Sequence, residues 1–304
     1  MKNFKFAITD NTVYEGKDLI DFYSKALLEG ATKSTFRVIP GVKSKIKVPR
    51  YDAGQIIKDA SCDWDSSGEG TLSQKEMEVC HKDIQIELCS DTFSSNFLGE
   101  YLRNGHNTGE VAPAVFTDYM INEIGKKVQN DLELAVWQGN KTGSTYPENI
   151  CDGLLKKLEE NVNVLNVTGT TLNLSNIIAE VSKVYEAIPA TVINNPELMI
   201  YVSDNIYRLY QQAIAAASNE SFYVSKKEPN FLGIPLHWSP GMPANQMVAC
   251  VSKNLVLLTD LLSDEEELSI IPQRNTRGVR TVRIVGGFKF GVDFSVGAEV
   301  VVYG

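Results

Sequence analysis

Two runs of charged residues near the C-terminus have the composition and spacing that recognition or chemistry would need. The acidic run is followed by arginines at every third position: Asp264, Glu265, Glu266, Glu267, then Arg274, Arg277, Arg280 and Arg283. Arginine forks bind carboxylates with paired hydrogen bonds, so the two runs could meet across a subunit boundary and fix its register. Exposed charge runs are commonly just solvated, however. A hydrolase groove is a weaker interpretation, because no catalytic carboxylate pair or nucleophile accompanies the arginines.

The usual motifs of active sites and cofactor sites are missing. The sequence contains no GxxxxGK[ST], HExxH, GxSxG or CxxC pattern. It therefore lacks the residues that a phosphate-binding loop, a zincin, a GxSxG hydrolase or a zinc ribbon requires. Gly68-Glu69-Gly70 is the nearest approach to a dinucleotide loop, but it neither follows a strand closely nor opens a helix. We therefore predict no catalytic residue and no cofactor, and we expect the protein not to be an enzyme.

The spacing of the cysteines and histidines is only weak evidence for a metal site. Cys62, Cys80, His81 and Cys89 could surround a metal, but Cys80 and His81 are adjacent on a predicted strand and would point to opposite faces. Five cysteines in a long chain without a recognisable export signal do not suggest a disulfide framework. We expect no metal and free thiols.

Composition places the chain among globular proteins. Its 304 residues are 43% hydrophobic and 22% charged, which is enough apolar material for about two domains. The net charge of −9 and pI near 5.0 disfavour a protein that grips nucleic acid by neutralising phosphates. No stretch approaches the ~18 apolar residues of a membrane span, so we expect no membrane partner and synthesis in the cytoplasm.

The strongest predicted element is a long amphipathic helix over residues 113–139. Its apolar residues recur at spacings of three and four: Ile121, Ile124, Val128, Leu132, Ala135 and Val136. Pro113 suits a first turn and Gly139 a stop. At 1.5 Å per residue the helix would be roughly 40 Å long, which exceeds an ordinary small domain.

An extended hairpin is predicted before this helix, over residues 41–90. Ile46 and Val48 alternate with lysines on one strand, and Met77 and Val79 alternate with polar residues on the other. The two strands flank a polar stretch of about 20 residues, which is unusual inside a compact domain unless it is functional. We expect this hairpin to find its partner on a neighbouring molecule.

A mixed α/β unit is predicted after the long helix. Helices are expected at 171–188 and 204–217, the second capped by Ser203, with strands at 198–202, 234–238, 247–251, 255–259 and 268–271. The strictest alternation ends the chain, with apolar residues at every second position: Phe290, Val292, Phe294, Val296, Ala298 and Val300. This pattern predicts a strand with one buried face.

The order of these elements, with the helix end ELAVWQGN and the segments FLGIPLHWSPGMPANQMVACVSKNLVLLTDL and VRIVGGFKFGVDFSVGAEVVVY, resembles a known family. The sequence is similar to the major capsid proteins of tailed bacteriophages with the Hong Kong 97-like fold. The resemblance covers nearly the full chain and implies an α+β fold. Residues 1–40 would be an N-terminal arm, 41–90 the extended loop, 91–145 with 272–304 a peripheral domain that holds spine helix 113–139, and 146–271 the axial domain.

The resemblance also implies partners and a location. Such a chain would assemble with itself into hexamers and pentamers of an icosahedral virion shell, built in the bacterial cytoplasm around double-stranded DNA without sequence-specific binding. A portal is implied as well. Because the sequence begins almost directly with the arm, we expect a separate scaffolding protein or a leader removed earlier. Two alternatives remain open: an encapsulin-like compartment shell, and a soluble α/β enzyme or binding protein.

Overall fold

The computed structural model describes residues 32, 34–54, 57, 59–60, 62, 70–89, 114–217, 229–260, 269–273 and 281–304. These residues divide between two compact units, drawn from 27–80, 129–260 and 289–304 in the larger unit and from 81–128 and 261–288 in the smaller. Most of the predicted N-terminal arm, residues 1–40, lies outside the described residues. Within the described part of the chain, no helix is long and apolar enough to cross a membrane.

The larger unit contains a six-stranded sheet in the order β5-β13-β9-β6-β8-β7. Its strands are β5 (Leu165–Val167), β6 (Leu198–Val202), β7 (Asn230–Phe231), β8 (Ile234–Trp238), β9 (Met247–Val251) and β13 (Val301–Tyr303). The central strand β9 is buried at all five positions. A strand that is buried on both faces has a continuous run of apolar residues, and the β9 sequence MVACV is such a run.

Two helices supply most of the remaining core of this sheet, α6 (Ile177–Ala187) and α7 (Asp204–Ala217). Val181 and Val184 of α6 and Ile206 of α7 are fully buried in one cluster with Ile200 of β6. These positions repeat at helical spacing, so each helix turns one apolar stripe to the strands. The alternation of strand and helix predicted for this region is confirmed.

Two local predictions in this unit were wrong. Helix α6 begins at Ile177 rather than at residue 171, because Asn173 Oδ1 accepts hydrogen bonds from the backbone N–H groups of Ser175 and Asn176 and forms a turn there instead. Ser203 does not cap α7: its buried hydroxyl has no hydrogen-bond partner among the described residues.

A second sheet of the larger unit is built on β10 (Leu255–Thr259). Strand β1 (Arg37–Ile39) pairs with it in parallel, and the second half of β12 (Thr281–Phe294) pairs with it antiparallel. The 3₁₀ turn η2 (Ser252–Asn254) leads directly from β9 into β10, so this short connection joins the two sheets.

The terminal alternating pattern does not form one strand. Asn254 Oδ1 accepts hydrogen bonds from the backbone N–H groups of Ser295 and Val296, and Asn254 Nδ2 donates to Val296 O. This side chain therefore ends β12 at Phe294. The chain continues through the 3₁₀ turn η3 (Gly297–Glu299), and β13 then joins the six-stranded sheet beside β9. The prediction of one continuous strand over residues 290–300 was wrong.

The long helix is α4 (Ala114–Gln138), within one residue of each predicted end. In its last turns Leu132, Val136 and Trp137 are buried, and Trp137 packs against Phe36 and Tyr201. A Cβ atom on Gly139 would lie 2.2 Å from Cys151 O, so glycine is required where α4 ends. The following segment holds η1 (Glu148–Ile150) and α5 (Leu154–Glu159).

The smaller unit is organised around the first half of β12. Strand β11 (Ser269–Pro272) pairs with it antiparallel, and β4 (Cys80–Cys89) pairs with it as well. β4 is the continuation of the predicted hairpin, so the two-stranded part of residues 41–90 is shorter than expected. The break falls at Val79, whose N–H donates to Ser44 O.

Candidate functional site

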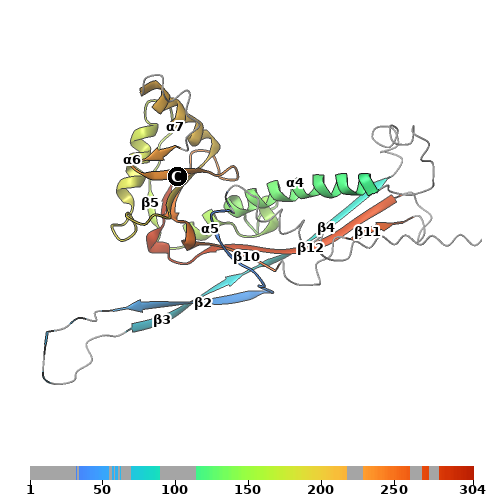
Figure 1. Cartoon of the computed structure of the whole chain (residues 1–304), viewed down its shortest axis with the longest axis horizontal. Coiled ribbons are helices and arrows are strands. Elements are labelled where there is room, and N and C mark those ends of the chain that lie inside the picture. The colour runs from blue at the N-terminus through green and yellow to red at the C-terminus, as the bar shows by residue number, and fades with distance from the viewer. Residues whose placement is uncertain are drawn as a thin grey trace, which may run out of the picture. The chain divides into compact units, whose positions relative to one another are not determined.

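A two-stranded hairpin with an exposed end is the most distinctive feature of the larger unit. It pairs β2 (Lys45–Ala53) with β3 (Gly70–Glu78), from Lys45 opposite Glu78 to Ala53 opposite Gly70 (Figure 1). We refer to the Lys45 end as the root and the Ala53 end as the tip. Because side chains alternate across a strand, the register gives this hairpin two faces with different residues.

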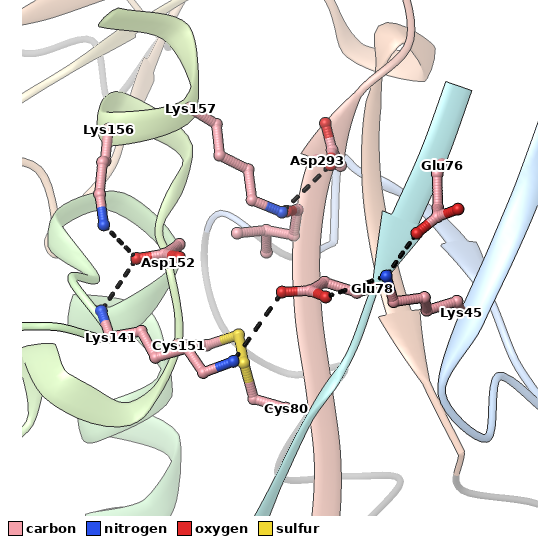
Figure 2. Close-up of polar contacts among 11 residues, drawn as sticks. Lys45, Glu76, Glu78, Cys80, Lys141, Cys151, Asp152, Lys156, Lys157 and Asp293 are labelled. Atoms are coloured by element: carbon pink, nitrogen blue, oxygen red, sulfur yellow. Dashed lines mark hydrogen bonds and ion pairs between the residues drawn. A yellow bond between two sulfur atoms is a disulfide. The ribbon is translucent and has the colours of Figure 1, made fainter. Parts of the chain in front are cut away.

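One face carries charges at the root. Lys45 Nζ lies 2.5 Å from Glu76 Oε1 and 3.9 Å from Glu78 Oε2, and all three side chains are about half exposed (Figure 2). The hydrogen bond from Lys45 is the main cause that lowers the pKa of Glu76. Exposed ion pairs of this kind contribute little stability, so this face orders the hairpin only weakly.

The opposite face fastens the root to β10. Met77 is 1% exposed and lies in a buried cluster with Val42, Val256 and Leu258, against which Ile46 and Val48 also pack. Burying an apolar side chain of this size stabilises by about 2 kcal/mol. The root is therefore ordered by its own chain, contrary to the expectation that the whole hairpin depends on a neighbour.

A buried carboxylate adds a polar anchor to the same face. Lys75 Nζ donates to Asp293 Oδ1 and to Phe294 O, at 2.5 Å each, and lies 3.4 Å from the centroid of the Phe294 ring. Lys157 of α5 donates to the other oxygen, Asp293 Oδ2, at 3.1 Å (Figure 2). Burial lowers the pKa of Lys75, although the charge of Asp293 opposes this shift. One aspartate thus ties the hairpin, β12 and α5 together.

A disulfide links the end of the hairpin root to the segment between α4 and α5. Cys80, at the start of β4, is bonded to Cys151, with the two Cα atoms 5.8 Å apart, and both residues are buried (Figure 2). The expectation of free thiols was therefore wrong for these two residues. Cys62 and Cys250 are free, the first exposed and the second buried. Counting cysteines could not detect a pair that only the fold brings together.

The backbone also approaches closely at the root. A Cβ atom on Gly291 of β12 would lie 2.4 Å from Glu78 O and 3.2 Å from Val79 Cα. Real Cβ atoms do not occupy such positions, so β12 passes the end of β3 at a distance that only glycine allows. Apolar packing, an ion pair, a disulfide and this contact together make the root rigid.

The tip is different, because both of its faces are exposed. Tyr51 and Leu72 are directly opposite each other and are 67% and 68% exposed, and Ile57 farther along the chain is 86% exposed. The Tyr51 ring covers the position that a Cβ atom of Gly70 would take. The Tyr51–Leu72 pair is an exposed apolar spot on the hairpin and a candidate interaction surface. A rigid root thus carries an apolar tip that the subunit itself does not bury.

The charged runs singled out in the sequence fall mostly outside the described residues, with Arg283 as the exception. Arg283 lies on β12, and its Nε and Nη2 atoms are each 3.1 Å from Oε2 of Glu87 on β4. It has a partner within its own chain. The acidic run and the other three arginines lie outside the described residues, so the subunit-contact role of the two runs stays a prediction.

One candidate ligand of the metal site considered in the sequence, Cys80, is not available to bind a metal. Cys80 is in the disulfide, and the neighbouring His81 Nε2 lies 3.7 Å from Asp83 Oδ1 with both side chains about 60% exposed. Among the described residues, no group of three or more His, Cys, Asp and Glu side chains is placed to hold a metal ion.

Comparison with known proteins finds similarity in structure only. No protein-family model and no curated protein matches the chain. The satellite phage P4 procapsid with its size determination protein is similar at TM-score 0.65 and 14% identity, over 98% of this chain and 92% of that one. The chain has a phage capsid fold.

Two further capsids support the assignment of the phage capsid fold. The capsid of the Myoviridae phage XM1 is similar at TM-score 0.57 and 14% identity, over 91% of this chain and 90% of that one. The capsid of an empty GTA particle, computed with C5 symmetry, is similar at TM-score 0.55 and 12% identity, over 99% and 94% of the two chains. The similarity predicted from the sequence is confirmed for the fold.

Proposed function

We propose that this chain is a structural, non-enzymatic major capsid protein of a tailed bacteriophage, with the Hong Kong 97-like organisation. The observation that carries the proposal is the match over nearly the whole length of both chains to the P4 procapsid, at TM-score 0.65. A match of that extent includes the hairpin and the long helix as well as the α/β core. It is therefore better support than a shared core alone.

In this proposal the chain assembles with itself into hexamers and pentamers that close an icosahedral shell. Five-fold symmetry was used for the similar GTA capsid, which fits a shell with pentameric vertices. Identical subunits in closed rings bury the same surface at each contact, so one apolar tip per chain is repeated around the particle. Tyr51 and Leu72 at the tip would be covered by the next copy.

The rigid root explains how such a contact forms without a large ordering cost. Fixing flexible residues at an interface opposes binding, and a preorganised element avoids much of that cost. Met77 and the Lys75–Asp293 pair hold the root before any partner arrives. We therefore propose that the hairpin is a preformed arm, ordered at its root by its own subunit and buried at its tip by a neighbour.

The Hong Kong 97-like organisation assigns the remaining regions. Residues 1–40 are the arm, 41–90 the extended loop, and 91–145 with 272–300 the peripheral domain. Residues 146–271 are the axial domain, to which we add β13 because it pairs with β9. Packaged double-stranded DNA, a portal and a separate scaffolding protein are the further partners. The net charge of −9 fits a shell that encloses DNA without binding it tightly.

Electron microscopy and sedimentation of the purified chain test the proposal. We expect closed particles from the wild-type chain, and folded subunits with much lower particle yield from Tyr51→Ser/Leu72→Ser. Lys47→Ser/Gln74→Ser is the matched control, since it changes exposed residues on the same face nearer the root. A wild-type chain that remains monomeric at all concentrations, or equal yields from both variants, would contradict the proposal.

Hydrogen exchange tests the role assigned to the hairpin. The amide of Met77, in the buried root, should be protected both in dissociated subunits and in particles. The amide of Leu72, near the exposed tip, should be protected only in particles. Equal protection of Leu72 in both states would show that the tip does not depend on a neighbour.

A further inference from the structure

The Cys80–Cys151 disulfide joins two segments at the root that are 71 residues apart in the sequence. Cys80 follows directly after the hairpin, and Cys151 follows η1 in the segment between α4 and α5. The two residues are 6% and 2% exposed. The bond therefore fixes the base of the hairpin to the end of the long helix, inside the protein.

Beside the disulfide, the same two segments are joined by a much weaker contact. Lys141 Nζ lies 3.9 Å from Glu78 Oε1, and the two side chains are 55% and 46% exposed (Figure 2). Exposed ion pairs contribute little in water and are screened by salt. Lys75 and Met77 fasten the hairpin to β12 and β10 instead. Whether the two sulfurs are bonded therefore decides how firmly the hairpin base is held to the 141–152 segment.

The bacterial cytoplasm keeps protein thiols reduced, and this is where the proposed function has the shell assembled. We propose that Cys80 and Cys151 are thiols while the shell assembles. They are then oxidised to the disulfide after the particle leaves the cytoplasm, and the bond locks the hairpin root. This inference rests on the proposed capsid function.

The oxidation is balanced if a low-molecular-weight disulfide is the oxidant. One protein thiolate attacks a sulfur of the small disulfide and releases one small thiolate, which forms a mixed disulfide. The second protein thiolate then attacks the protein sulfur of that mixed disulfide and releases the second small thiolate. Two protein thiols become one disulfide, and the small disulfide accepts the two electrons and two protons and becomes two thiols. Burial means that the root must open for this exchange, and the same burial then shields the finished bond.

The thiol state before and after release is the direct test. Cells that express the chain are quenched with acid, the protein is unfolded and alkylated with N-ethylmaleimide, and the cysteine-containing peptides are identified by mass spectrometry. We expect Cys80 and Cys151 to be alkylated in cells, and to be joined in released particles incubated with oxidised glutathione. Disulfide already complete in cells, or thiols that persist in the incubated particles, would overturn the inference.

The mechanical role is tested on the same particles by dissociation in guanidinium chloride. Wild-type particles treated with reductant should dissociate about tenfold faster than oxidised ones. Cys80→Ala/Cys151→Ala particles should dissociate at the fast rate with or without reductant, while Cys62→Ser, which alters an exposed free thiol, should behave as wild type. Equal rates for reduced and oxidised wild-type particles would overturn the lock, whether or not the double variant folds.

The same experiment separates this inference from the proposed function. If no particles form, the capsid proposal fails, and the thiol state of isolated subunits still shows whether the pair closes in the oxidising buffer. If particles form and the thiols do not change on release, only the inferred lock fails.

Discussion

The Nζ atom of Lys75 lies 2.5 Å from Oδ1 of Asp293, although the two residues are 218 positions apart in the sequence. Asp293 is buried, with a side chain 7% exposed, and it also accepts a hydrogen bond from Lys157. A buried carboxylate is costly unless it is paired and hydrogen-bonded. The hairpin lysine is therefore part of what allows β12 to carry an acid in its buried half.

Replacing Lys75 by methionine should weaken the larger unit. The variant keeps the apolar stem over Phe294 but leaves Asp293 with only Lys157 as a charged partner among these contacts. We expect the free energy of unfolding to fall by about 1–2 kcal/mol, less than for a fully buried pair broken outright. Lys45→Met, on the exposed face, should leave stability unchanged within error. Equal losses in chemical denaturation would contradict the anchoring role of Lys75.

Gly291 should not tolerate a side chain. Alanine there would place Cβ 2.4 Å from Glu78 O, which is backbone and cannot move without shifting the root. We expect Gly291→Ala to lower the free energy of unfolding by about 1–3 kcal/mol. Gly287→Ala in the same strand is the control, since its nearest atom, His81 Nε2, is 3.4 Å away. Thermal unfolding of both variants checks this, and equal stability would contradict the close approach.

The sequence predicted well those elements whose own residues determine them. Strands β6, β8, β9 and β10 begin and end where short apolar runs meet turn residues, and α7 matches its predicted bounds. In these segments burial on both faces or a helical stripe gives a signal that needs no knowledge of distant partners. The bounds of α4 were predicted for the same reason.

The candidate site was harder to predict because distant residues build it. Cys80 and Cys151 meet only once β4 leaves the hairpin and α4 has ended, and no local spacing marks such a pair. Asp293 has the pattern of a polar member of an alternating strand, yet its side chain is buried where Lys75 of the hairpin and Lys157 of α5 contact it. The alternation at 290–300 likewise concealed the bend that Asn254 imposes.

Leu232 should limit the stability of the isolated subunit. It occupies the two-residue turn between β7 and β8 with φ of +47° and is 70% exposed. A left-handed conformation costs a non-glycine residue about 1 kcal/mol, and asparagine accepts it more readily than leucine. We therefore expect Leu232→Asn to raise the free energy of unfolding by about 0.5–1 kcal/mol.

The neighbouring glycine provides the opposite control. Gly233 has φ of +91° and open space around its Cβ position, so Gly233→Ala tests backbone strain alone and should destabilise. Urea unfolding of both variants measures the two effects. A loss of stability in Leu232→Asn would contradict the strain argument.

Glu180 should make the α/β unit sensitive to acid. The hydrogen bond from Lys183 is the main cause that holds the pKa of Glu180 below its usual 4.5, and the Tyr303 hydroxyl adds a hydrogen bond at 2.9 Å. A lowered folded-state pKa means that the contribution is complete at neutral pH and is lost as the pH falls below about 4.5. Glu180→Gln should lower the free energy of unfolding by about 1 kcal/mol at pH 7.

The difference in the free energy of unfolding between wild type and Glu180→Gln should therefore shrink as the pH falls from 5 to 3. Glu186→Gln, an exposed position of the same helix, should leave the pH profile unchanged. Thermal unfolding across this range is the measurement. A difference that stays constant down to pH 3 would show that the Glu180 contacts do not depend on its charge.

Arg283 provides a reference for the charged runs, because its partner is known. Reversing it in Arg283→Glu places two acids opposite each other on β4 and β12, so we expect a loss of subunit stability of about 0.5–1 kcal/mol. Glu87→Arg in the same chain should restore it. This pattern, with stability as the readout, is that of a contact within one subunit.

Arg277 and Arg280 are predicted to behave differently, as contacts between subunits. If they pair with the acidic run of a neighbour, Arg277→Glu or Arg280→Glu should give subunits of normal stability that fail to close into particles, because a loss of about 1 kcal/mol recurs at every interface of the shell. Changing Glu265 or Glu266 to Arg should partly restore closure. Sedimentation of the single and double variants at low and moderate salt distinguishes a contact between subunits from a solvated face. Normal particles from both single variants would mean that these arginines form only a solvated face.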